Sequence, residues 1–282
     1  MVIFHKREPL RRELLSLAKE GKTIGLVPTM GALHAGHLSL VEEAAAENDV
    51  VVVSIFVNPT QFDNKEDLHK YPRDLEKDID LLNAVQPGIL IFAPAVEEVY
   101  TGDIAPSSFD FDGLEFQMEG KFRQGHFDGV GTIVKRLFEI VGPDNAYFGE
   151  KDYQQLQIIR TLVKKHRIPV KVHGCPIRRE ENGLAMSSRN ERLSDEQRKE
   201  AGFIYETLKT VKAEFGTKSV QEIREQVSEA FRKHPSFRLE YMEIANAETL
   251  RPAEQKETGQ KYRAFIAVYA GEVRLIDNIA LN

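Results

Sequence analysis

Apolar runs and amphipathic segments alternate along the first two-thirds of the chain. Residues 22–27 form a short apolar run typical of a buried strand, and residues 49–57 form a longer run rich in β-branched side chains. The segment between them carries apolar side chains at helical spacing, namely Leu38, Val41, Ala44 and Ala45. Two buried strands joined by one helix make a βαβ unit, and this unit predicts a parallel sheet.

The alternation continues as far as residue 177. The further elements that it predicts are a helix after Arg73, a strand at 89–92, a helix at 127–141, a strand at 145–148, a helix at 154–166 and a strand at 170–177. Residues 100–125 contain Pro, Gly and Asp and are expected to form a long loop. Long loops in compact domains are often functional.

Beyond residue 177 the pattern changes. Residues 178–183 are polar and turn-rich, which is typical of a hinge. The elements predicted after it are helices at 194–215 and 220–231 and strands at 239–245, 263–270 and 272–279, the last two forming an antiparallel hairpin at Gly271. The predicted fold class is therefore α/β, with a Rossmann-like parallel sheet in an N-terminal domain at residues 1–184 and a smaller α+β lid domain at residues 185–282.

Composition narrows the classes of function. The 282 residues are 41% hydrophobic and 29% charged, which is ordinary for a globular protein, and the formal net charge of −6 argues against a surface adapted to nucleic acid. The single cysteine, Cys175, is expected to be a small buried hydrophobe on a strand. The sequence contains no apolar stretch of membrane-spanning length and no signal-peptide core after Met1, so we expect a cytoplasmic protein.

His34 and His37 point most directly to chemistry. They lie three residues apart, after a predicted strand and at the start of a predicted helix, so both imidazoles can face one ligand. The helix start adds N–H groups and the positive end of a dipole, and Gly36 leaves room for a phosphate. Such a turn suits the α-phosphate of a nucleotide, because the imidazoles can donate hydrogen bonds to developing negative charge and one can protonate the leaving pyrophosphate.

Two other interpretations of this turn stay open. The histidines could begin an ordinary helix, although their place after the strand of a βαβ unit weakens that interpretation. A zinc site is disfavoured because no third ligand stands at a familiar spacing.

Other segments are expected to complete the site. Residues 149–152 lie where another strand runs into a helix, so Lys151 should reach the same sheet edge and suits phosphate oxygens. Of Gln154 and Gln155, one is expected to bond a substrate and the other to be scaffold. Gln61 ends the second buried strand, where an amide can orient a hydroxyl or a carboxylate.

The segment at residues 186–190, Met-Ser-Ser-Arg-Asn, follows the predicted hinge. Its hydroxyls, N–H groups and guanidinium can wrap a pyrophosphate, although a helix-capping loop would use the same residues. Together with the histidines they favour a mobile closing loop. Residues 71–73 and 123–130 are candidate walls of a substrate site.

Taken in order, these segments resemble the pantothenate synthetase (pantoate–β-alanine ligase) family. The matching motifs are P-T-M-G-A-L-H-x-G-H, V-N-P-x-Q-F, Y-P-R, R-x-G-H-F-x-G-V, G-E-K-D-[YF]-Q-Q, G-L-A-M-S-S-R-N and R-L-I-D-N, which span the chain from about Thr23 to Asn278. The H-x-G-H turn alone would indicate only the wider nucleotidyltransferase superfamily. The combination is far more specific.

The resemblance implies a two-step reaction. ATP and pantoate would give pantoyl adenylate and pyrophosphate, and β-alanine would then displace AMP to form pantothenate, with Mg²⁺ on the phosphates and no protein ligand assigned to the metal. It also implies a homodimer. The residues that it assigns to ATP are Met30, Gly31, Ala32, Leu33, His34, Ala35, Gly36, His37, Gly149, Glu150, Lys151, Asp152, Arg178, Met186, Ser187, Ser188 and Arg189.

Within that set the resemblance gives catalytic roles to His34, His37, Lys151, Ser187, Ser188 and Arg189. His37 would be the proton donor. Gln61 would touch both pantoate and β-alanine, and Gln155 would touch pantoate. The chain departs from the family pattern at Gln124, at Arg178 and in the loop at residues 99–102, and none of these changes removes a residue with a chemical role.

Two other functions remain as hypotheses. A nucleotidyltransferase that moves AMP onto a phosphate-bearing substrate would want extra Lys or Arg in its acceptor pocket, where the candidates here are Gln61 and Gln155. A nucleotide-binding sensor without activity is disfavoured because both histidines, Lys151 and the Ser-Ser-Arg segment are retained.

Overall fold

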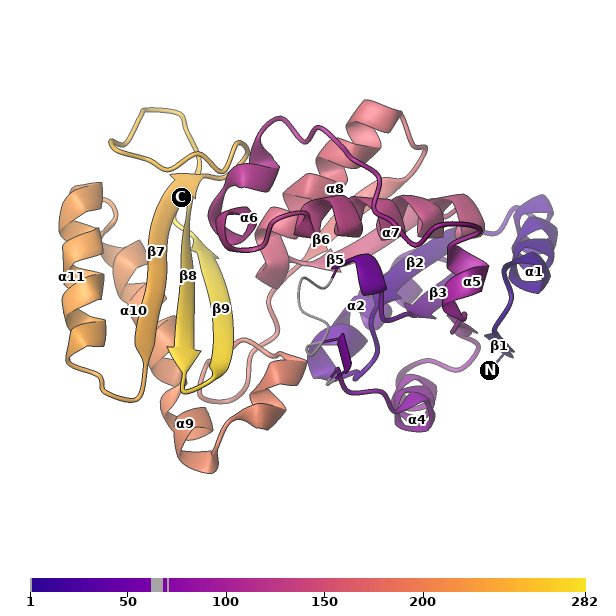
Figure 1. Ribbon diagram of the computed structural model, residues 1–282, viewed down its shortest axis with the longest axis horizontal. Helices are drawn as coiled ribbons and strands as arrows, with labels where there is room; N and C mark the ends of the chain where they lie inside the picture. The colour runs from indigo at the N-terminus through magenta and orange to yellow at the C-terminus, as the bar shows by residue number, and fades with distance from the viewer. Residues whose placement is uncertain (1, 62–67, 70) are drawn as a thin grey trace. The chain divides into compact units, whose positions relative to one another are not determined.

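The computed structural model describes residues 2–61, 68–69 and 71–282 (Figure 1). Contacts within the chain define two compact units: unit 1 comprises Met1–Glu150 and Gln154–Pro176, and unit 2 comprises Lys151–Tyr153 and Ile177–Asn282. The change of sequence pattern after residue 177 coincides with this boundary. The division expected at residue 184 lies a short way inside unit 2.

Six parallel strands form the sheet of unit 1, in the spatial order β1-β4-β3-β2-β5-β6. The strands are β1 (Val2–Phe4), β2 (Ile24–Thr29), β3 (Val50–Ile55), β4 (Leu90–Phe92), β5 (Asn145–Gly149) and β6 (Lys171–Cys175). From β2 the chain builds β3 and β4 on one side and then returns to build β5 and β6 on the other. Ligands of open parallel sheets bind outside the carboxyl ends of the strands at such a reversal of strand order.

Both faces of this sheet are covered, which explains the unbroken apolar run of β3. Val51 and Val53 pack into a buried cluster with side chains of α2 (Ala35–Glu47) and α4 (Leu75–Val85), and Val52 between them is also fully buried. The remaining helices of this part of the chain are α1 (Arg7–Lys19), α5 (Val96–Val99), α6 (Met118–Phe122), α7 (His126–Val141) and α8 (Tyr153–His166). The predicted α/β class is confirmed.

The sequence pattern missed the first two elements and part of a third region. β1 is a three-residue edge strand with exposed side chains, and α1 buries only Leu10 and Leu14 among many charged residues, so neither gives a strong periodic signal. The expected loop at residues 100–125 contains a 3₁₀ turn, η2 (Leu114–Phe116), and the short helix α6. That part of the loop prediction was wrong, because five-residue helices are too short to show a period.

Unit 2 is built on a three-stranded antiparallel sheet in the order β7-β8-β9 (Figure 1). Its elements are α9 (Asp195–Glu200), α10 (Gly202–Glu214), α11 (Val220–Arg232), β7 (Arg238–Asn246), β8 (Tyr262–Ala270) and β9 (Val273–Ala280). Side chains of α10 and α11 form one buried cluster with those of the sheet. Ser194 and Ser219 begin α9 and α11 with complete capping boxes. The predicted α+β organisation is confirmed.

One predicted helix, at residues 194–215, is two helices in the structure. The side-chain amide of Asn182 donates to the carbonyls of Arg198 (2.7 Å) and Lys199 (3.3 Å), which belong to the last turn of α9. These carbonyls would otherwise accept from the next turn of a continuing helix. The break therefore depends on a residue outside the helix, and the helical periodicity could not reveal it.

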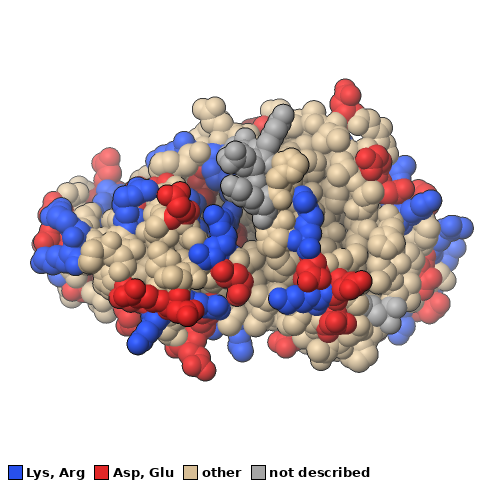
Figure 2. Space-filling model, turned by 60° about the horizontal axis from the view of Figure 1, so that its bottom comes forward, with Lys and Arg blue, Asp and Glu red and all other residues tan. Residues whose placement is uncertain are grey.

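Charged side chains of both signs are interspersed over the face seen in Figure 2. This distribution agrees with the near-balance of acidic and basic residues in the sequence. Within the described ranges, none of the helices combines the length and the apolar character that a membrane crossing requires.

Candidate active site

The H-x-G-H turn and the Lys151 turn follow adjacent parallel strands. β2 pairs with β5 in the register Gly25↔Asn145, β2 leads into α2 through residues 30–34, and β5 leads into α8 through the 3₁₀ turn η3 (Glu150–Asp152). Both turns therefore begin at carboxyl strand ends on the two sides of the strand-order reversal. The prediction that they share one edge of the sheet is confirmed by this pairing.

The loop that precedes the histidines adopts an unusual backbone. Gly31 has φ of +81° and Ala32 has φ of +50°, both in the left-handed region. The positive φ favours glycine at position 31, and a Cβ there would also crowd a carboxylate oxygen of Asp78 at 3.0 Å. The Gly31 N–H donates to Thr29 Oγ1 (3.2 Å), and that hydroxyl donates to the carbonyl of Ser54 (2.7 Å) on β3.

The side chain of Asp78 in α4 accepts hydrogen bonds from the same loop. Its Oδ2 accepts from the N–H of Ala32 (3.0 Å) and its Oδ1 accepts from the N–H of Leu33 (2.7 Å). The residue is 2% exposed, and this burial raises the pKa of its carboxyl although the two N–H bonds oppose the shift. Sequence reasoning missed Asp78. An acid on the buried stripe of α4, between Leu75 and Leu82, is a signal that could have found it.

His34 is the N-cap of α2, and its ring is fixed by the helix that it begins. Nδ1 accepts from the N–H of Gly36 at 3.1 Å, so a neutral His34 carries its proton on Nε2, where it is a hydrogen-bond donor. The His37 ring lies beside it, with centroids 4.1 Å apart and planes inclined by 39°. The structure therefore brings the two histidines together. It also shows that His34 caps the helix, in agreement with the alternative interpretation that the histidines begin an ordinary helix.

Gln61 ends the 3₁₀ turn η1 (Pro59–Gln61) after β3, and α7 packs closely on that turn. A Cβ on Gly129 of α7 would lie 2.2 Å from the carbonyl oxygen of Thr60, so only glycine allows this approach. The Gln61 carbonyl accepts from Nδ1 of His126 (3.0 Å) and from Arg123 (3.5 Å). The R-x-G-H-F-x-G-V segment, expected as a substrate wall, thus supports the backbone of Gln61. Phe62, the next residue of the V-N-P-x-Q-F motif, lies outside the described residues.

The two glutamines at the start of α8 have different surroundings. Gln154 is 4% exposed, accepts from the N–H of Glu119 and donates to the carbonyls of Leu114 and Gln117. These bonds hold the η2–α6 segment, so we interpret Gln154 as the scaffold member of the pair. Gln155 is only half-buried and remains the candidate for substrate.

Lys151 belongs to unit 2 and its side chain is 18% exposed. Its ammonium lies 3.9 Å from a carboxylate oxygen of Asp152, and its backbone carbonyl accepts from Nδ2 of Asn278 (2.9 Å) on β9. The ammonium is thus carried on a turn whose backbone is bonded to a strand far along the chain.

In unit 2 the expected hinge is a small hairpin. Arg179 bridges Ala185, the N–H of Met186 donates to the carbonyl of Arg178 (3.0 Å), and Ser187 follows at once. Ser187 Oγ accepts from the N–H of Arg189 (3.3 Å) at the start of the 3₁₀ turn η4 (Ser188–Arg192). The capping interpretation of this segment is therefore correct for the Ser187 oxygen.

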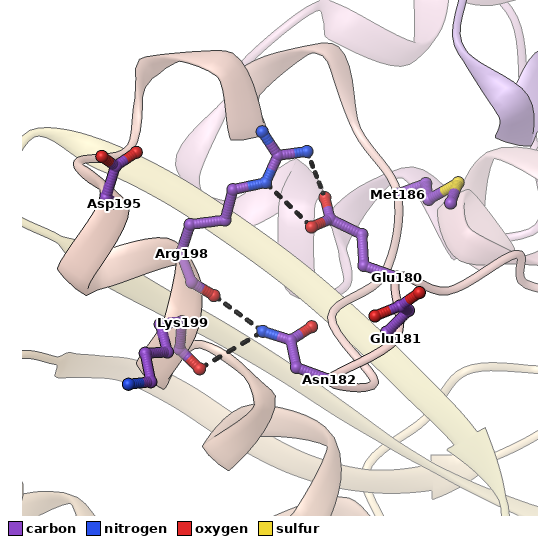
Figure 3. Close-up of a pocket in the computed structure, with 7 residues that line it drawn as sticks. All are labelled: Glu180, Glu181, Asn182, Met186, Asp195, Arg198 and Lys199. Atoms are coloured by element: carbon purple, nitrogen blue, oxygen red, sulfur yellow. Dashed lines mark hydrogen bonds and ion pairs between the residues drawn. The ribbon is translucent and has the colours of Figure 1, made fainter.

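A cavity lies beside this hairpin (Figure 3). Met186 is the residue of the expected nucleotide set that lines it. Glu180 accepts from the guanidinium of Arg198 at 2.8 Å and 3.1 Å, and the Asn182 amide reaches the end of α9 (Figure 3). These bonds brace the hairpin against α9 and fix the place from which residues 187–189 depart. Arg178 and Arg189 themselves are exposed.

Cys175 ends β6 and is buried, as expected from the sequence. Burial raises the pKa of its thiol, with Glu43 and other nearby carboxylates adding to the shift. A thiol in such a place is held protonated and is a poor nucleophile.

A parallel sheet with an H-x-G-H turn at the reversal of its strand order is typical of an α/β enzyme that binds its ligand at this edge. Comparison with known proteins narrows this class. The family model described as pantoate-beta-alanine ligase matches residues 2–280, and the chain belongs to this family.

Its relatives agree over the full length. The chain is 56% identical to the pantothenate synthetases of Christiangramia forsetii and Flavobacterium psychrophilum, covering 100% of this chain and of each relative. A crystal structure of the Thermus thermophilus pantothenate synthetase is 45% identical with a TM-score of 0.90, covering 100% of this chain and 99% of that one.

A further solved structure was determined with ligands. The Francisella tularensis pantoate–β-alanine ligase, described as complexed with β-γ ATP and β-alanine, is 38% identical with a TM-score of 0.81, covering 100% of this chain and 98% of that chain. The family expected from the motifs is thus confirmed, as is the prediction of a carbon–nitrogen ligase that joins pantoate and β-alanine to give pantothenate.

Proposed function

We propose that the chain makes pantothenate through a pantoyl adenylate. A pantoate carboxylate oxygen attacks the α-phosphorus of ATP, and the bond to the pyrophosphate oxygen breaks. The nitrogen of β-alanine, as the neutral amine, then attacks the acyl carbon, the bond from that carbon to the AMP oxygen breaks, and the amide forms with release of one amine proton. The observation that carries this proposal is the histidine pair at the carboxyl end of β2, with rings 4.1 Å apart and His34 fixed by Gly36.

The histidines act on the phosphates in this proposal. His34 donates from Nε2 to an α-phosphate oxygen, because its Nδ1 is already an acceptor for the N–H of Gly36. His37 donates a proton to the leaving pyrophosphate. Neither needs to act as a base, because a carboxylic acid with a pKa of about 4 is already ionised at neutral pH.

The loop and the turn around these residues supply the rest of the nucleotide site. We assign to ATP the residues Met30, Gly31, Ala32, Leu33, His34, Ala35, Gly36, His37, Gly149, Glu150, Lys151, Asp152, Arg178, Met186, Ser187, Ser188 and Arg189. Among them, Lys151 and Arg189 offset the charge of two anions that must be held together, and the hydroxyls of Ser187 and Ser188 donate to phosphate oxygens.

Gln61 and Gln155 are assigned to the organic substrates. Gln61 has a backbone fixed by His126 and Arg123, so its amide is presented from a constrained turn. A neutral amide can orient the pantoate hydroxyls and the β-alanine carboxylate without adding charge. Gln155 contacts pantoate, since Gln154 is committed to the η2–α6 segment.

Mg²⁺ is expected to arrive with the nucleotide. Among the described residues, no group of three or more His, Cys, Asp or Glu is arranged to hold a metal ion. Magnesium in nucleotide sites is commonly held by phosphate oxygens with one or two carboxylates, and Glu150 and Asp152 flank Lys151 with that chemistry. The metal would neutralise charge on the phosphates.

The homodimer, the cytoplasmic location and the lid role of residues 185–282 stay predictions. The dimer is checked by light scattering after size-exclusion chromatography.

Isotope exchange between pyrophosphate and ATP tests the proposal. We expect exchange with Mg-ATP and pantoate alone, and AMP formation only when β-alanine is also present. Exchange that depends on phosphopantetheine, or none with pantoate, would contradict the adenylate and favour AMP transfer to a phosphate-bearing substrate. Nucleotide binding without exchange or product would indicate the sensor hypothesis.

A further inference from the structure

The R-L-I-D-N motif of β9 has had no role so far. Its last two residues, Asp277 and Asn278, are 4% and 2% exposed, although they are polar and stand within an apolar strand. Buried polar side chains are kept where they have specific partners. The partners of this pair are two segments already assigned to ATP.

Asn278 bonds to the Lys151 turn. Its Nδ2 donates to the Lys151 carbonyl at 2.9 Å, across 127 residues of sequence, and its Oδ1 accepts from Arg263 of β8. The guanidinium of Arg263 in turn lies 3.9 Å from the centroid of the Tyr153 ring. The segment Lys151–Tyr153 is therefore tied to the sheet of unit 2 at both of its ends.

Asp277 bonds to the hairpin. It accepts from Nη1 and Nη2 of Arg179 at 2.6 Å and 3.0 Å, and Arg179 also donates to the Gly183 carbonyl (3.0 Å) and lies 3.6 Å from the Tyr205 ring centroid. Arg179 is thereby held by a carboxylate, a backbone carbonyl and an aromatic ring, and the hairpin that it anchors leads directly into Ser187. Asp277 Oδ1 also accepts from the N–H of Asn278 (2.7 Å), which fixes the two side chains relative to each other.

We propose that Asp277 and Asn278 are positioning residues for adenylation, which hold the Lys151 turn and the Arg179 hairpin on one strand. The proposal rests on the phosphate roles assigned above to Lys151 and Arg189. A lysine ammonium stands on a flexible stem, so its mean position is only as well defined as the backbone that carries it. A misplacement of about 1 Å at a reacting group can cost about 100-fold in rate.

The test separates a positioning role from a general structural one. We compare Asn278→Ala, Lys151→Ala and the double variant in the pantoate-dependent pyrophosphate exchange at saturating substrates. Asn278→Ala is expected to lower the exchange rate about 10-fold. In the Lys151→Ala background the same change should alter the rate less than about 2-fold, because the ammonium that Asn278 positions is gone.

Asn282→Ala is the matched control. Asn282 also donates from Nδ2 to a backbone carbonyl at 2.9 Å, that of Gln260, in the same unit. We expect its exchange rate to equal that of the unmodified protein. Circular dichroism and thermal unfolding establish that each variant is folded. If Asn278→Ala does not fold, Asn278→Leu replaces it, because leucine fills a similar volume and removes the donor to Lys151 without adding a charge.

A normal exchange rate in the folded Asn278 variant overturns the inference. So does a loss that multiplies with that of Lys151→Ala, since a general distortion of unit 2 would behave in that way. Normal exchange in Lys151→Ala itself instead contradicts the phosphate role of Lys151, and this failure belongs to the proposed function.

Discussion

The histidine turn and the lysine turn are held by opposite chemistry. The loop before His34 gives two backbone N–H groups to the carboxylate of Asp78, whereas the Lys151 turn gives a carbonyl to the amide of Asn278. The first arrangement places an acid beneath a loop that is proposed to bind phosphate. The second uses a neutral donor beside a cation.

This difference follows from what each turn must present. The N–H groups of Ala32 and Leu33 are bonded to Asp78, and this loop has a left-handed backbone at Gly31 and Ala32. The Asp152 carboxylate already lies 3.9 Å from the Lys151 ammonium, and a second carboxylate there would compete further with a phosphate for the cation. Asn278 can fix the turn without adding a charge there. The three predictions below test this comparison.

The largest effect on stability is expected from loss of the ion pair between Asp277 and Arg179. Asp277→Ala leaves the Arg179 guanidinium without its two carboxylate bonds in a buried site. We expect the free energy of unfolding to fall by about 3–5 kcal/mol. Urea denaturation followed by circular dichroism measures it.

The control for this variant is Glu229→Ala. Glu229 pairs with Arg232 and Lys233 on the exposed face of α11, where an ion pair contributes little. A comparable loss of unfolding free energy in both variants would mean that the Asp277–Arg179 ion pair stabilises the protein no more than an exposed ion pair does.

The next effect concerns the histidine turn itself. His34→Ala is expected to slow pyrophosphate exchange about 100-fold, because it removes the donor proposed above for the α-phosphate. His34→Asn separates this role from helix capping, since asparagine is a good N-cap. We expect both variants to be slow. A nearly normal rate in the asparagine variant would mean that His34 caps α2 and has no role at the α-phosphate.

The smallest effect is a pH dependence at Asp78. Burial raises the pKa of this carboxyl above its ordinary value of 3.8, so the folded state holds the proton more tightly than the unfolded state. The stability that Asp78 contributes is therefore fully present below pH 3.8 and is lost as pH rises through the raised pKa.

Asp78→Asn does not titrate and has one acceptor fewer for the loop, which should cost about 1–2 kcal/mol at the acidic end. Urea denaturation of both proteins from about pH 3.5 to pH 7 should show this difference shrinking as pH rises. A difference that grows with pH would mean that Asp78 is stabilised as a carboxylate.

The turns that carry the proposed side-chain roles could be placed from the sequence, whereas the residues that support those turns were not identified from it. His34, Lys151 and Gln61 each follow a strand whose apolar run is visible, so the topology of a parallel sheet brings their turns to one edge. Asp78 and Asn278 act on backbone groups 45 and 127 residues away. The spacing of residues along the chain does not predict such a long-range hydrogen bond. What the sequence shows is a polar residue among the apolar residues of a helix or strand.

The same limit applies to the fold. The buried strands β2, β3 and β5 were predicted because both faces of the sheet are covered. The short edge strand β1 has exposed side chains, and the break between α9 and α10 comes from Asn182 in a neighbouring hairpin. The periodicity of apolar residues indicates which residues of an element are buried. It does not indicate a hydrogen bond from a residue distant in sequence.

Unit 2 is discontinuous, because residues Lys151–Tyr153 belong to it while the residues on both sides belong to unit 1. Neither unit is therefore one continuous stretch of the chain. A fragment that begins at Ile177 would lack the turn that Asn278 and Arg263 hold, and a fragment that ends at Pro176 would carry that turn without its support. Exchanging the C-terminal part between relatives therefore requires the matching Lys151 segment to be exchanged with it.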